Sequence, residues 1–382
     1  RWKNHMKVCI LQITCGVKCM TFLRIVYCCA WQVKCIIQKS IFAIIKNLLI
    51  SSEKRNKLKT CYNYPCNVGG FIMELLCVDR KEYEKIIKQE KYVYNAAWFH
   101  EINRTKVDQL YYLLFKSKKY KFFGIAGIKD GIIKFPYSAP FSIIEKRSED
   151  VSLEDIDDAL QLLDEFGRQH SVQSIRFRLP PAFYDENYIN KFQNCLLRNG
   201  YEIETWDLNY QYIIRDLSYL DSKIKRNAKK NLHTAEAYDY KLAHCENEEQ
   251  KREAYHIISE NRQSKGYPLR MTWEQVEATI QYMIHDFFIL YWNDKAIAAA
   301  VIFRVTNEVY QVIYWGDRPG YSEYRPMNYL SYHLYEYYCK KGIQVLDIGP
   351  STEEGIPNYG LCSFKESIGC DVSSKLTLVR KL

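Results

Sequence analysis

The sequence lacks an apolar run long enough to cross a membrane in its most apolar part, residues 8–50. The longest uncharged run there, VCILQITCGV, has ten residues, whereas a membrane-spanning helix needs about twenty. A secretory signal is not indicated either, because no single apolar core connects a short basic start to a small-residue cleavage site. We therefore expect a cytoplasmic protein, with the inner membrane surface as the alternative location.

The sequence also lacks the spacings of several common functional sites. Eight of the 14 cysteines lie before residue 73, and the pairs Cys15/Cys19 and Cys28/Cys29 have no matching CxxC or HxxxH half. An HExxH helix, a glycine-rich nucleotide fingerprint and a Ser-His-Asp order of recognisable spacing are missing as well. We expect no metal, and reduced cysteines fit the cytoplasmic location.

Positive charge is in excess only in the first 72 residues. The formal net charge is +9, but residues 1–72 hold 12 Lys and Arg against a single acid, Glu53. Of the 54 basic and 45 acidic residues in the chain, 42 and 44 remain in residues 73–382, a net charge of −2. A strongly basic balance is typical of nucleic-acid-binding proteins. The composition therefore argues against DNA as a partner.

The first 72 residues differ from the rest in a way that suggests a non-native origin. The chain begins with Arg1, and Gly69-Gly70 can be encoded by GGAGGN, a purine-rich ribosome-binding sequence two codons before Met73. We hypothesise that residues 1–72 are a translated leader rather than a domain, and that the native protein starts at Met73. The nucleotide sequence would decide this hypothesis.

From Met73 onward the same order of elements occurs twice. The chain has 382 residues, of which 47% are hydrophobic, enough for two ordinary cores. In each half we expect a strand hairpin, a helix and a further strand. For the first half these are strands in 121–144, a helix over 153–168, a strand in 174–180, a helix over about 188–198 and a strand from 203.

The second half begins with expected helices over 218–238 and 247–265. Thr272 has the position of an N-cap and Gln275 completes a capping box, so another helix should follow. Strands are expected at 287–292, 295–305 and 308–316, separated by the Asn293-Asp294 and Thr306-Asn307 turns. A helix from about Met327 should end at Gly342 and lead to the strand IQVLDIG.

Two tandem units of this kind resemble the FemABX-type peptidyltransferases and their FemAB-related GNAT relatives in bacteria. Three stretches carry the resemblance: LSYLDSKIKRNAKKNLHTAEAYDY, YRPMNYLSYHLYEYYCKKGIQVLDIGPS and the Phe-Lys motif in SFKESIG. The resemblance implies a mixed α+β fold of two GNAT-like domains, 73–216 and 217–382, each with a mostly antiparallel sheet and a crossover helix. The second domain would carry the donor site.

Two departures from the family pattern bear on the acyl donor. The Arg/Gln-x-x-Gly-x-Gly/Ala loop that cradles the pyrophosphate of coenzyme A in many GNAT enzymes is replaced by SEYRPMN. A helix N-terminus and Arg325 still offer donors to a phosphate. The long charged helix pair of the tRNA-dependent members is also missing, which weakens an aminoacyl-tRNA donor.

The resemblance implies acyl transfer from an acyl-CoA, such as acetyl-CoA, to an amino group of a small molecule or a cell-envelope precursor. Peptidoglycan or polysaccharide precursors are the envelope candidates. The alternatives are an aminoacyl-tRNA-dependent peptidoglycan bridge aminoacyltransferase and a catalytically inactive binding module. In GNAT-like folds the strands on either side of the crossover helix splay apart and expose backbone donors to the acyl group. Here these strands would be EVYQVIYWG and IQVLDIG.

Candidate site residues follow from these positions. Lys365 would reach the donor's phosphates or the developing negative charge, on a half-exposed strand where the adjacent Phe364 faces the core. Asp347 would orient the loop from Gly349 to Asn358 or polarise the amine, or only cap a turn. Tyr314 could be the general acid, or a core residue like its neighbour. The remaining candidates are Arg325, Asn328, Ser351 and Phe364 for the donor, and Lys225, Arg226 and Trp315 for the acceptor, with a solvated helix face as the alternative for Lys225, Arg226, Lys229 and Lys230.

Overall fold

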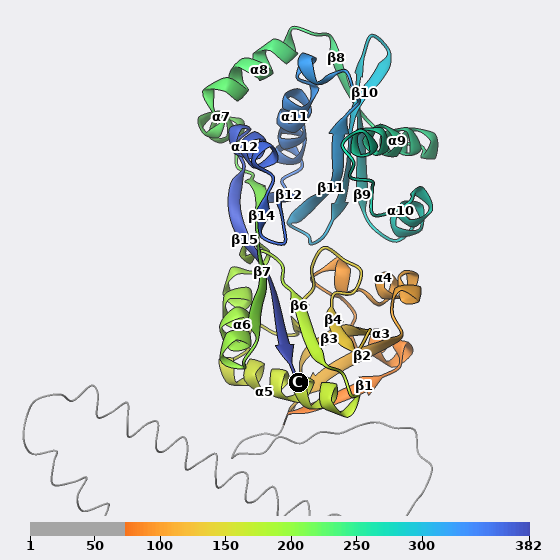
Figure 1. Ribbon diagram of the computed structural model, residues 1–382, viewed down its shortest axis with the longest axis vertical. Coiled ribbons are helices and arrows are strands. Elements are labelled where there is room, and N and C mark those ends of the chain that lie inside the picture. The colour runs from red at the N-terminus through yellow and green to blue at the C-terminus, as the bar shows by residue number, and fades with distance from the viewer. Residues whose placement is uncertain (1–72) are drawn as a thin grey trace, which may run out of the picture. The chain divides into compact units, whose positions relative to one another are not determined.

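The computed structural model describes residues 73–382, so the leader hypothesis for residues 1–72 lies outside the described residues. The first repeat runs from β1 to β7 (Figure 1). Its elements are β1 (Glu74–Val78), α3 (Arg80–Ile86), η1 (Val93–Asn95), α4 (Ala97–Ile102), η2 (Arg104–Lys106), β2 (Gln109–Lys116), β3 (Tyr120–Lys129), β4 (Ile132–Phe135), β5 (Glu145–Lys146), α5 (Leu153–Gln169), β6 (Ser174–Arg178), η3 (Ala182–Tyr184), α6 (Glu186–Arg198) and β7 (Glu202–Ile213).

The second repeat follows directly and ends with the C-terminal strand. Its elements are α7 (Leu217–Lys223), α8 (Arg226–Glu236), β8 (Tyr240–His244), α9 (Glu248–Ser264), α10 (Trp273–Ile280), β9 (His285–Trp292), β10 (Lys295–Arg304), β11 (Val309–Asp317), η4 (Ser322–Tyr324), α11 (Pro326–Lys340), β12 (Val345–Pro350), β13 (Thr352–Glu353), β14 (Ile356–Pro357), α12 (Tyr359–Ser367) and β15 (Asp371–Lys381).

Local sequence signals explain most of these boundaries. The Thr272 hydroxyl accepts a hydrogen bond from the Gln275 backbone N–H, and the Gln275 side-chain oxygen accepts one from the Thr272 backbone N–H. The predicted capping box of α10 is therefore confirmed. Gly342 has φ of 73° just after α11, the left-handed position that ends helices without a Cβ penalty. Asn293 and Asp294 both have positive φ, as a two-residue hairpin between β9 and β10 requires.

Thirteen strands of the described region form one continuous sheet in the order β1-β2-β3-β4-β6-β15-β7-β12-β11-β10-β9-β8, with β5 paired to β3. Two of its strand pairs are parallel, and each joins the strands on either side of a crossover helix: β4 and β6 around α5, and β11 and β12 around α11. All other pairs in this sheet are antiparallel. The hairpin, helix and strand unit predicted twice from the sequence is therefore present twice.

The C-terminal strand β15 belongs to the sheet of the first repeat rather than to its own. It inserts between β6 and β7, and its residues from Asp371 onward pair with β7 along nearly their whole length. β7 in turn pairs with β12 at its C-terminal end. Figure 1 shows β7 and β15 running side by side where the two repeats meet. One strand, β15, therefore lies in the sequence after the proposed division at residue 216 but pairs with strands that lie before it.

Candidate functional site

The strands β11 and β12 separate after three paired residues. Their parallel register ends at Gln311 and Asp347, although β11 continues to Asp317 and β12 to Pro350. On its other edge β12 stays paired with β7 along its whole length, from Val345 to Pro350. The predicted splay between the strands that flank the crossover helix is therefore present.

Both strands are irregular where they separate. In β11, Tyr314 and Val312 have consecutive partners on β10, so Ile313 is an extra residue. In β12, Asp347 and Gly349 have consecutive partners on β7, so Ile348 is an extra residue there. Such bulges re-aim the backbone and side chains next to them and are common beside active sites. The splay is thus bordered on both sides by backbone that departs from regular pairing.

Adjacent residues of β11 line opposite faces of the sheet at the splay. Trp315 is buried on the face covered by α8, α11 and α12, and its ring meets that of Phe364 edge-on at 6.2 Å. Tyr314 lies on the other face, where it packs against the core that includes α9. Burial raises the pKa of the Tyr314 hydroxyl. The two aromatic candidates therefore cannot contact the same face of one substrate.

Asp347 is fully buried and forms the centre of a hydrogen-bond network. Its Oδ1 accepts from Asn209 Nδ2 at 2.8 Å and from the Gly349 N–H at 2.8 Å. Its Oδ2 accepts from the Tyr184 hydroxyl at 2.8 Å and from Gln311 Nε2 at 2.7 Å. Gln311 Oε1 then accepts from the Tyr94 hydroxyl at 2.7 Å. The carboxylate thus connects the start of the splay to residues of both repeats.

The structure contradicts the predicted environment of Lys365. The residue lies on α12 instead of a strand, and it is only 2% exposed. Its ammonium group donates to the carbonyls of Ile348, Gly349 and Pro350 at 3.0, 2.8 and 3.1 Å. All three donors of the ammonium group are therefore used. Burial lowers the pKa of Lys365 to about 8.

The predicted environments of Phe364 and Lys365 were wrong because both residues lie on a helix and not on a strand. We expected Phe364 in the core and Lys365 half-exposed, because adjacent strand residues face opposite ways. On the helix, Lys365 is the buried residue and Phe364 is only partly buried, against Trp315. Phe364 therefore borders the splay, while Lys365 braces the end of β12 from within.

The N-terminus of α11 offers fewer donors than the sequence suggested. Arg325 is exposed and has a left-handed backbone with φ of 59°. Pro326 has no N–H, the Arg325 N–H bonds to Ser322 and the Asn328 N–H bonds to Arg325. Asn328 is itself buried and lines a small hollow against α8. A phosphate at this end would depend chiefly on the Arg325 guanidinium.

The remaining candidates lie around α12. Lys225 occupies the N-cap position of α8 without a side-chain cap bond, and its ammonium group bonds to Glu366 at 3.1 Å. The neighbouring Arg226 is exposed on the same helix. Ser351 is buried just after β12, and its hydroxyl has no partner among the described residues. The hairpin of β13 and β14 follows, and its Thr352 hydroxyl donates to Asp207 at 2.6 Å. The loop after the splayed strand is therefore folded onto β7.

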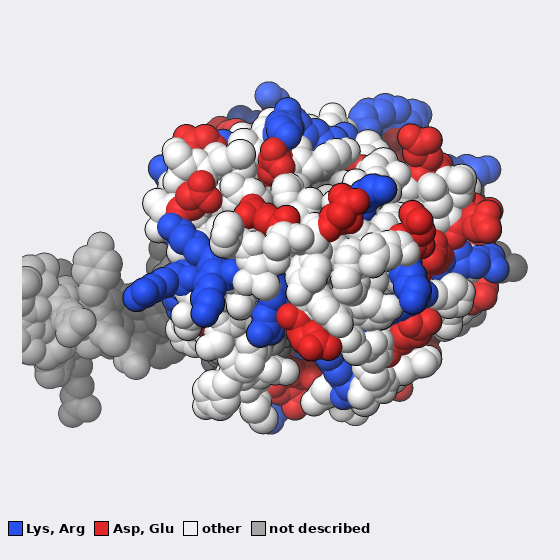
Figure 2. All heavy atoms as spheres, turned by 90° about the horizontal axis from the view of Figure 1, so that it is seen from above, with Lys and Arg blue, Asp and Glu red and all other residues white. Residues whose placement is uncertain are grey.

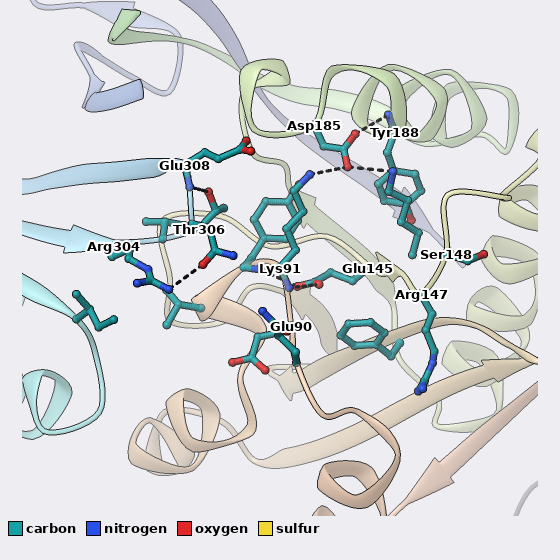
Figure 3. Close-up of a pocket in the computed structure, with 18 of the residues that line it drawn as sticks. Glu90, Lys91, Glu145, Arg147, Ser148, Asp185, Tyr188, Arg304, Thr306 and Glu308 are labelled. Atoms are coloured by element: carbon teal, nitrogen blue, oxygen red, sulfur yellow. Dashed lines mark hydrogen bonds and ion pairs between the residues drawn. The ribbon is translucent and has the colours of Figure 1, made fainter. Parts of the chain in front are cut away.

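A cavity of about 620 Å³ lies elsewhere between the repeats, beside β5 and the β10–β11 turn (Figure 3). Four of its charged side chains, Lys91, Lys146, Glu149 and Asp185, are paired with one another. Lys91 bonds to Asp185 at 2.8 Å, and Glu145 accepts from the backbone N–H groups of Lys91 and Tyr92. Burial raises the pKa of Glu145 to about 7. The residues that line this cavity do not include Gln311, Asp347 or the splayed ends.

Charged side chains of both signs lie on the surface of the described residues. Figure 2 shows basic and acidic side chains interspersed over the face seen from above. No helix within residues 73–382 is both long and apolar enough to span a bilayer. In the same range, no three His, Cys, Asp or Glu side chains are grouped so that they could hold a metal ion.

A splayed parallel strand pair that flanks a crossover helix is the arrangement expected of a GNAT-like fold. Residues 222–359 match the family described as the acetyltransferase (GNAT) domain. Part of the second repeat therefore matches the GNAT domain family, in line with the predicted resemblance, and the predicted fold class is confirmed.

Two solved structures share the fold over most of the chain. FemX superposes with a TM-score of 0.57 at 12% identity, covering 81% of this chain and 97% of FemX. L-PGS from Bacillus licheniformis superposes with a TM-score of 0.52 at 13% identity, covering 79% of this chain and 92% of L-PGS. No curated protein sequence matches the chain significantly. These likenesses extend the tandem fold to the first repeat.

Sequence reasoning missed a group of basic residues on the Tyr314 face. Lys375 of β15 is 6% exposed, Arg178 of β6 is half-buried, and the Arg262 Nε of α9 is buried. The alternation of polar residues in DVSSKLTLVR indicated one polar strand face. It gave no sign that this face would be buried, because the insertion of β15 between β6 and β7 is a long-range pairing.

Proposed function

We propose that the protein transfers an acyl group from an acyl-CoA to an amino group of an acceptor, at the splay between β11 and β12. The observation that carries the proposal is the separation of these strands after Gln311 and Asp347, with bulges at Ile313 and Ile348. Such a gap lets an extended acyl–pantetheine chain approach backbone groups that regular pairing would occupy.

The donor is assigned to the α11 face and the acceptor to the Tyr314 face. Phe364 and Trp315 supply an apolar wall on the α11 side of β11, and Arg325 lies at the N-terminus of α11 on the same side. The opposite face presents the Tyr314 hydroxyl and the Asp347 network. In this arrangement the thioester reaches the start of the splay from one face, and the amine attacks from the other.

The chemistry asks for positioning more than for reactive side chains. The amine nitrogen attacks the thioester carbonyl and loses one proton, the carbon–sulfur bond breaks, and the leaving thiolate takes up a proton, so that an amide and a free thiol result. Backbone donors at a bulge can stabilise the oxyanion, a contribution of about 10²–10³ in turnover for a preorganised donor. Tyr314 is our candidate for the acid that protonates the thiolate, which it would have to reach from the acceptor face through the gap between β11 and β12. Asp347 and Lys365 act as positioning residues, because their polar atoms are occupied within the fold.

The choice of acceptor follows the family resemblance, which points to a small molecule or a cell-envelope precursor. Calorimetry of the full chain with acetyl-CoA tests the donor. We expect saturable binding that Trp315→Ala weakens, while Tyr282→Ala beside the separate cavity leaves it unchanged. Absence of acetyl-CoA binding, with stabilisation by an envelope oligosaccharide instead, would support the inactive binding module.

A further inference from the structure

Residues 91–95, which include η1, link the first repeat to the start of the splay. The Tyr94 hydroxyl donates to Gln311 Oε1 at 2.7 Å, and Gln311 Nε2 donates to Asp347 Oδ2 at 2.7 Å. Because Gln311 Oε1 has its donor in Tyr94, the amide keeps its N–H group toward the carboxylate. Tyr94 and Gln311 are both buried. The position of Tyr94 therefore helps to set the orientation of Gln311 and Asp347.

One side chain of β5, Glu145, holds this segment in place. Its Oε2 accepts from the Lys91 N–H at 2.7 Å. Its Oε1 accepts from the Tyr92 N–H at 3.1 Å and from Asn95 Nδ2 at 2.8 Å. The three donors lie on either side of Tyr94 in the sequence. Both ends of the segment are therefore attached to the same carboxyl group, and a shift of Glu145 would displace Tyr94.

The end of the segment at Asn95 has additional anchors. Asn95 Nδ2 also donates to the Ile143 carbonyl at 2.9 Å, and Asn95 Oδ1 accepts from the Ser142 hydroxyl at 2.6 Å. These bonds join neutral groups, so their strength does not depend on pH. The backbone at the Lys91 end is held by Glu145, whose charge does depend on pH.

Glu145 is buried without a counter-charge. The two lysines beside it, Lys91 and Lys146, form their ion pairs with Asp185 and Glu149 instead. Within residues 73–382, no cation forms an ion pair with Glu145. The other charged or ionisable groups around it come from the neighbouring elements and are Tyr83 of α3, Glu90 and Tyr92 before η1, Arg147 after β5 and Tyr188 of α6.

Glu145 lines the cavity beside β5, which gives protons a route to its carboxyl group (Figure 3). Burial raises the pKa of Glu145 from 4.5 to about 7, and its three hydrogen bonds offset only part of this effect. In the held arrangement the carboxyl group therefore binds a proton more tightly than it would in water. By linkage, the hold on the segment is strongest at acidic pH and weakens as pH rises from about 4.5 to about 7.

We propose that Glu145 is a positioning residue for the transfer reaction, because it keeps residues 91–95 in place and thereby supports Gln311 and Asp347 through the Tyr94 hydroxyl. The inference rests on the proposed function, in which the acyl group reaches the splay beside Asp347. The first repeat thus takes part in the reaction, since Glu145 and Tyr94 both come from it. Ionisation of Glu145 loosens the support, which gives the positioning role a pH-dependent readout.

Residue-resolved hydrogen–deuterium exchange of the full chain, without any ligand and at several pH values, tests the hold on the segment. After correction for the intrinsic exchange rate, protection of residues 91–95 should fall about tenfold from pH 6 to pH 8 and stay constant above, as the pKa values of 4.5 and about 7 require. Glu145→Gln should show no such step. Glu202→Gln, at an exposed glutamate of β7, is the matched control and should behave like the parent.

The Gly349 amide reports the other end of the connection, because it donates to Asp347 Oδ1 at 2.8 Å. Its protection should fall over the same pH range in the parent and be independent of pH in Tyr94→Phe. Residues 91–95 should keep their pH step in Tyr94→Phe, since Glu145 still holds them. This variant also keeps the test decisive if circular dichroism shows that Glu145→Gln does not fold.

Protection of residues 91–95 that does not change with pH in the parent, or a pH step at Gly349 that persists in Tyr94→Phe, would overturn the connection. These measurements use no acyl donor, so their outcome is separate from that of the proposed function. Thiol release from acetyl-CoA tests the role in the reaction. Turnover of the parent relative to Glu145→Gln should fall as pH rises through about 7, with KM unchanged. Identical pH profiles would refute the positioning role, whereas a parent that releases no thiol would refute the proposed function.

Discussion

Replacing Lys365 by methionine removes an internal brace of the splayed strand and should destabilise the fold. The ammonium group donates to three carbonyls of β12, at 3.0, 2.8 and 3.1 Å. Hydrogen bonds to a charged group contribute about 1.5–3 kcal/mol each. Relief from burying the charge offsets part of this loss. We expect a net decrease of about 2–4 kcal/mol in the free energy of unfolding at neutral pH.

Urea denaturation followed by tryptophan fluorescence measures this decrease. Trp315 of β11 is a suitable probe because it packs against Phe364, the neighbour of Lys365 on α12. Lys81→Met is the control and should change stability by less than about 0.5 kcal/mol, as for an exposed site. A Lys365→Met protein as stable as the control would refute the reasoning. It would show that the three carbonyls do not need the ammonium group.

The same variant should change the dependence of stability on pH. The pKa of Lys365 is about 8 in the folded state and 10.5 for an unperturbed lysine. Between these values the unfolded state binds more protons, so this group makes the parent more stable as pH rises, by up to about 1.4 kcal/mol per pH unit. Methionine does not bind a proton, so the Lys365→Met variant lacks this contribution to the pH dependence of stability. The stability gap between parent and variant should therefore widen from pH 7.5 to 9.5, and a constant gap would contradict the assignment.

Three further variants test the other parts of the site. Asp347→Asn places an amide against two hydrogen-bond donors and should cost about 2–4 kcal/mol of stability in urea, whereas the exposed Asp239→Asn should cost little. Arg325→Ala should weaken acetyl-CoA binding about tenfold in calorimetry and reduce its salt dependence, because few backbone donors remain there. Tyr314→Phe should slow acetyl-CoA-dependent thiol release by about 10²-fold with donor affinity unchanged. An equal rate would exclude Tyr314 as the acid.

Much of the fold could be predicted because its signals are local. The capping box at Thr272, the Asn293-Asp294 turn and Gly342 each fix an element by interactions within a few residues. The repeated order of hairpin, helix and strand then placed the splay between the correct two strands. Residues of the Asp347 network could be located on their strands for the same reason. Their partners could not, since Tyr184 and Asn209 come from the first repeat.

The Phe-Lys motif shows where local reasoning ended. The segment from Tyr359 to Ser367 is a nine-residue helix, and alternation between Phe364 and Lys365 suggested a strand. One signal was available: the Asn358 side chain accepts from the Leu361 N–H, the pattern of an N-cap. The burial of Lys365 depends on carbonyls 15 to 17 residues earlier in the chain. Only the folded arrangement brings these groups together.

The central claim is that the acyl donor lies in the splay between β11 and β12. Hydrogen–deuterium exchange of the full chain with and without acetyl-CoA tests it most directly. We predict that protection increases in residues 312–316, in residues 348–350 and at the start of α11. Protection confined to residues 89–93 and 304–308, which line the separate cavity, would contradict the account and move the donor site there.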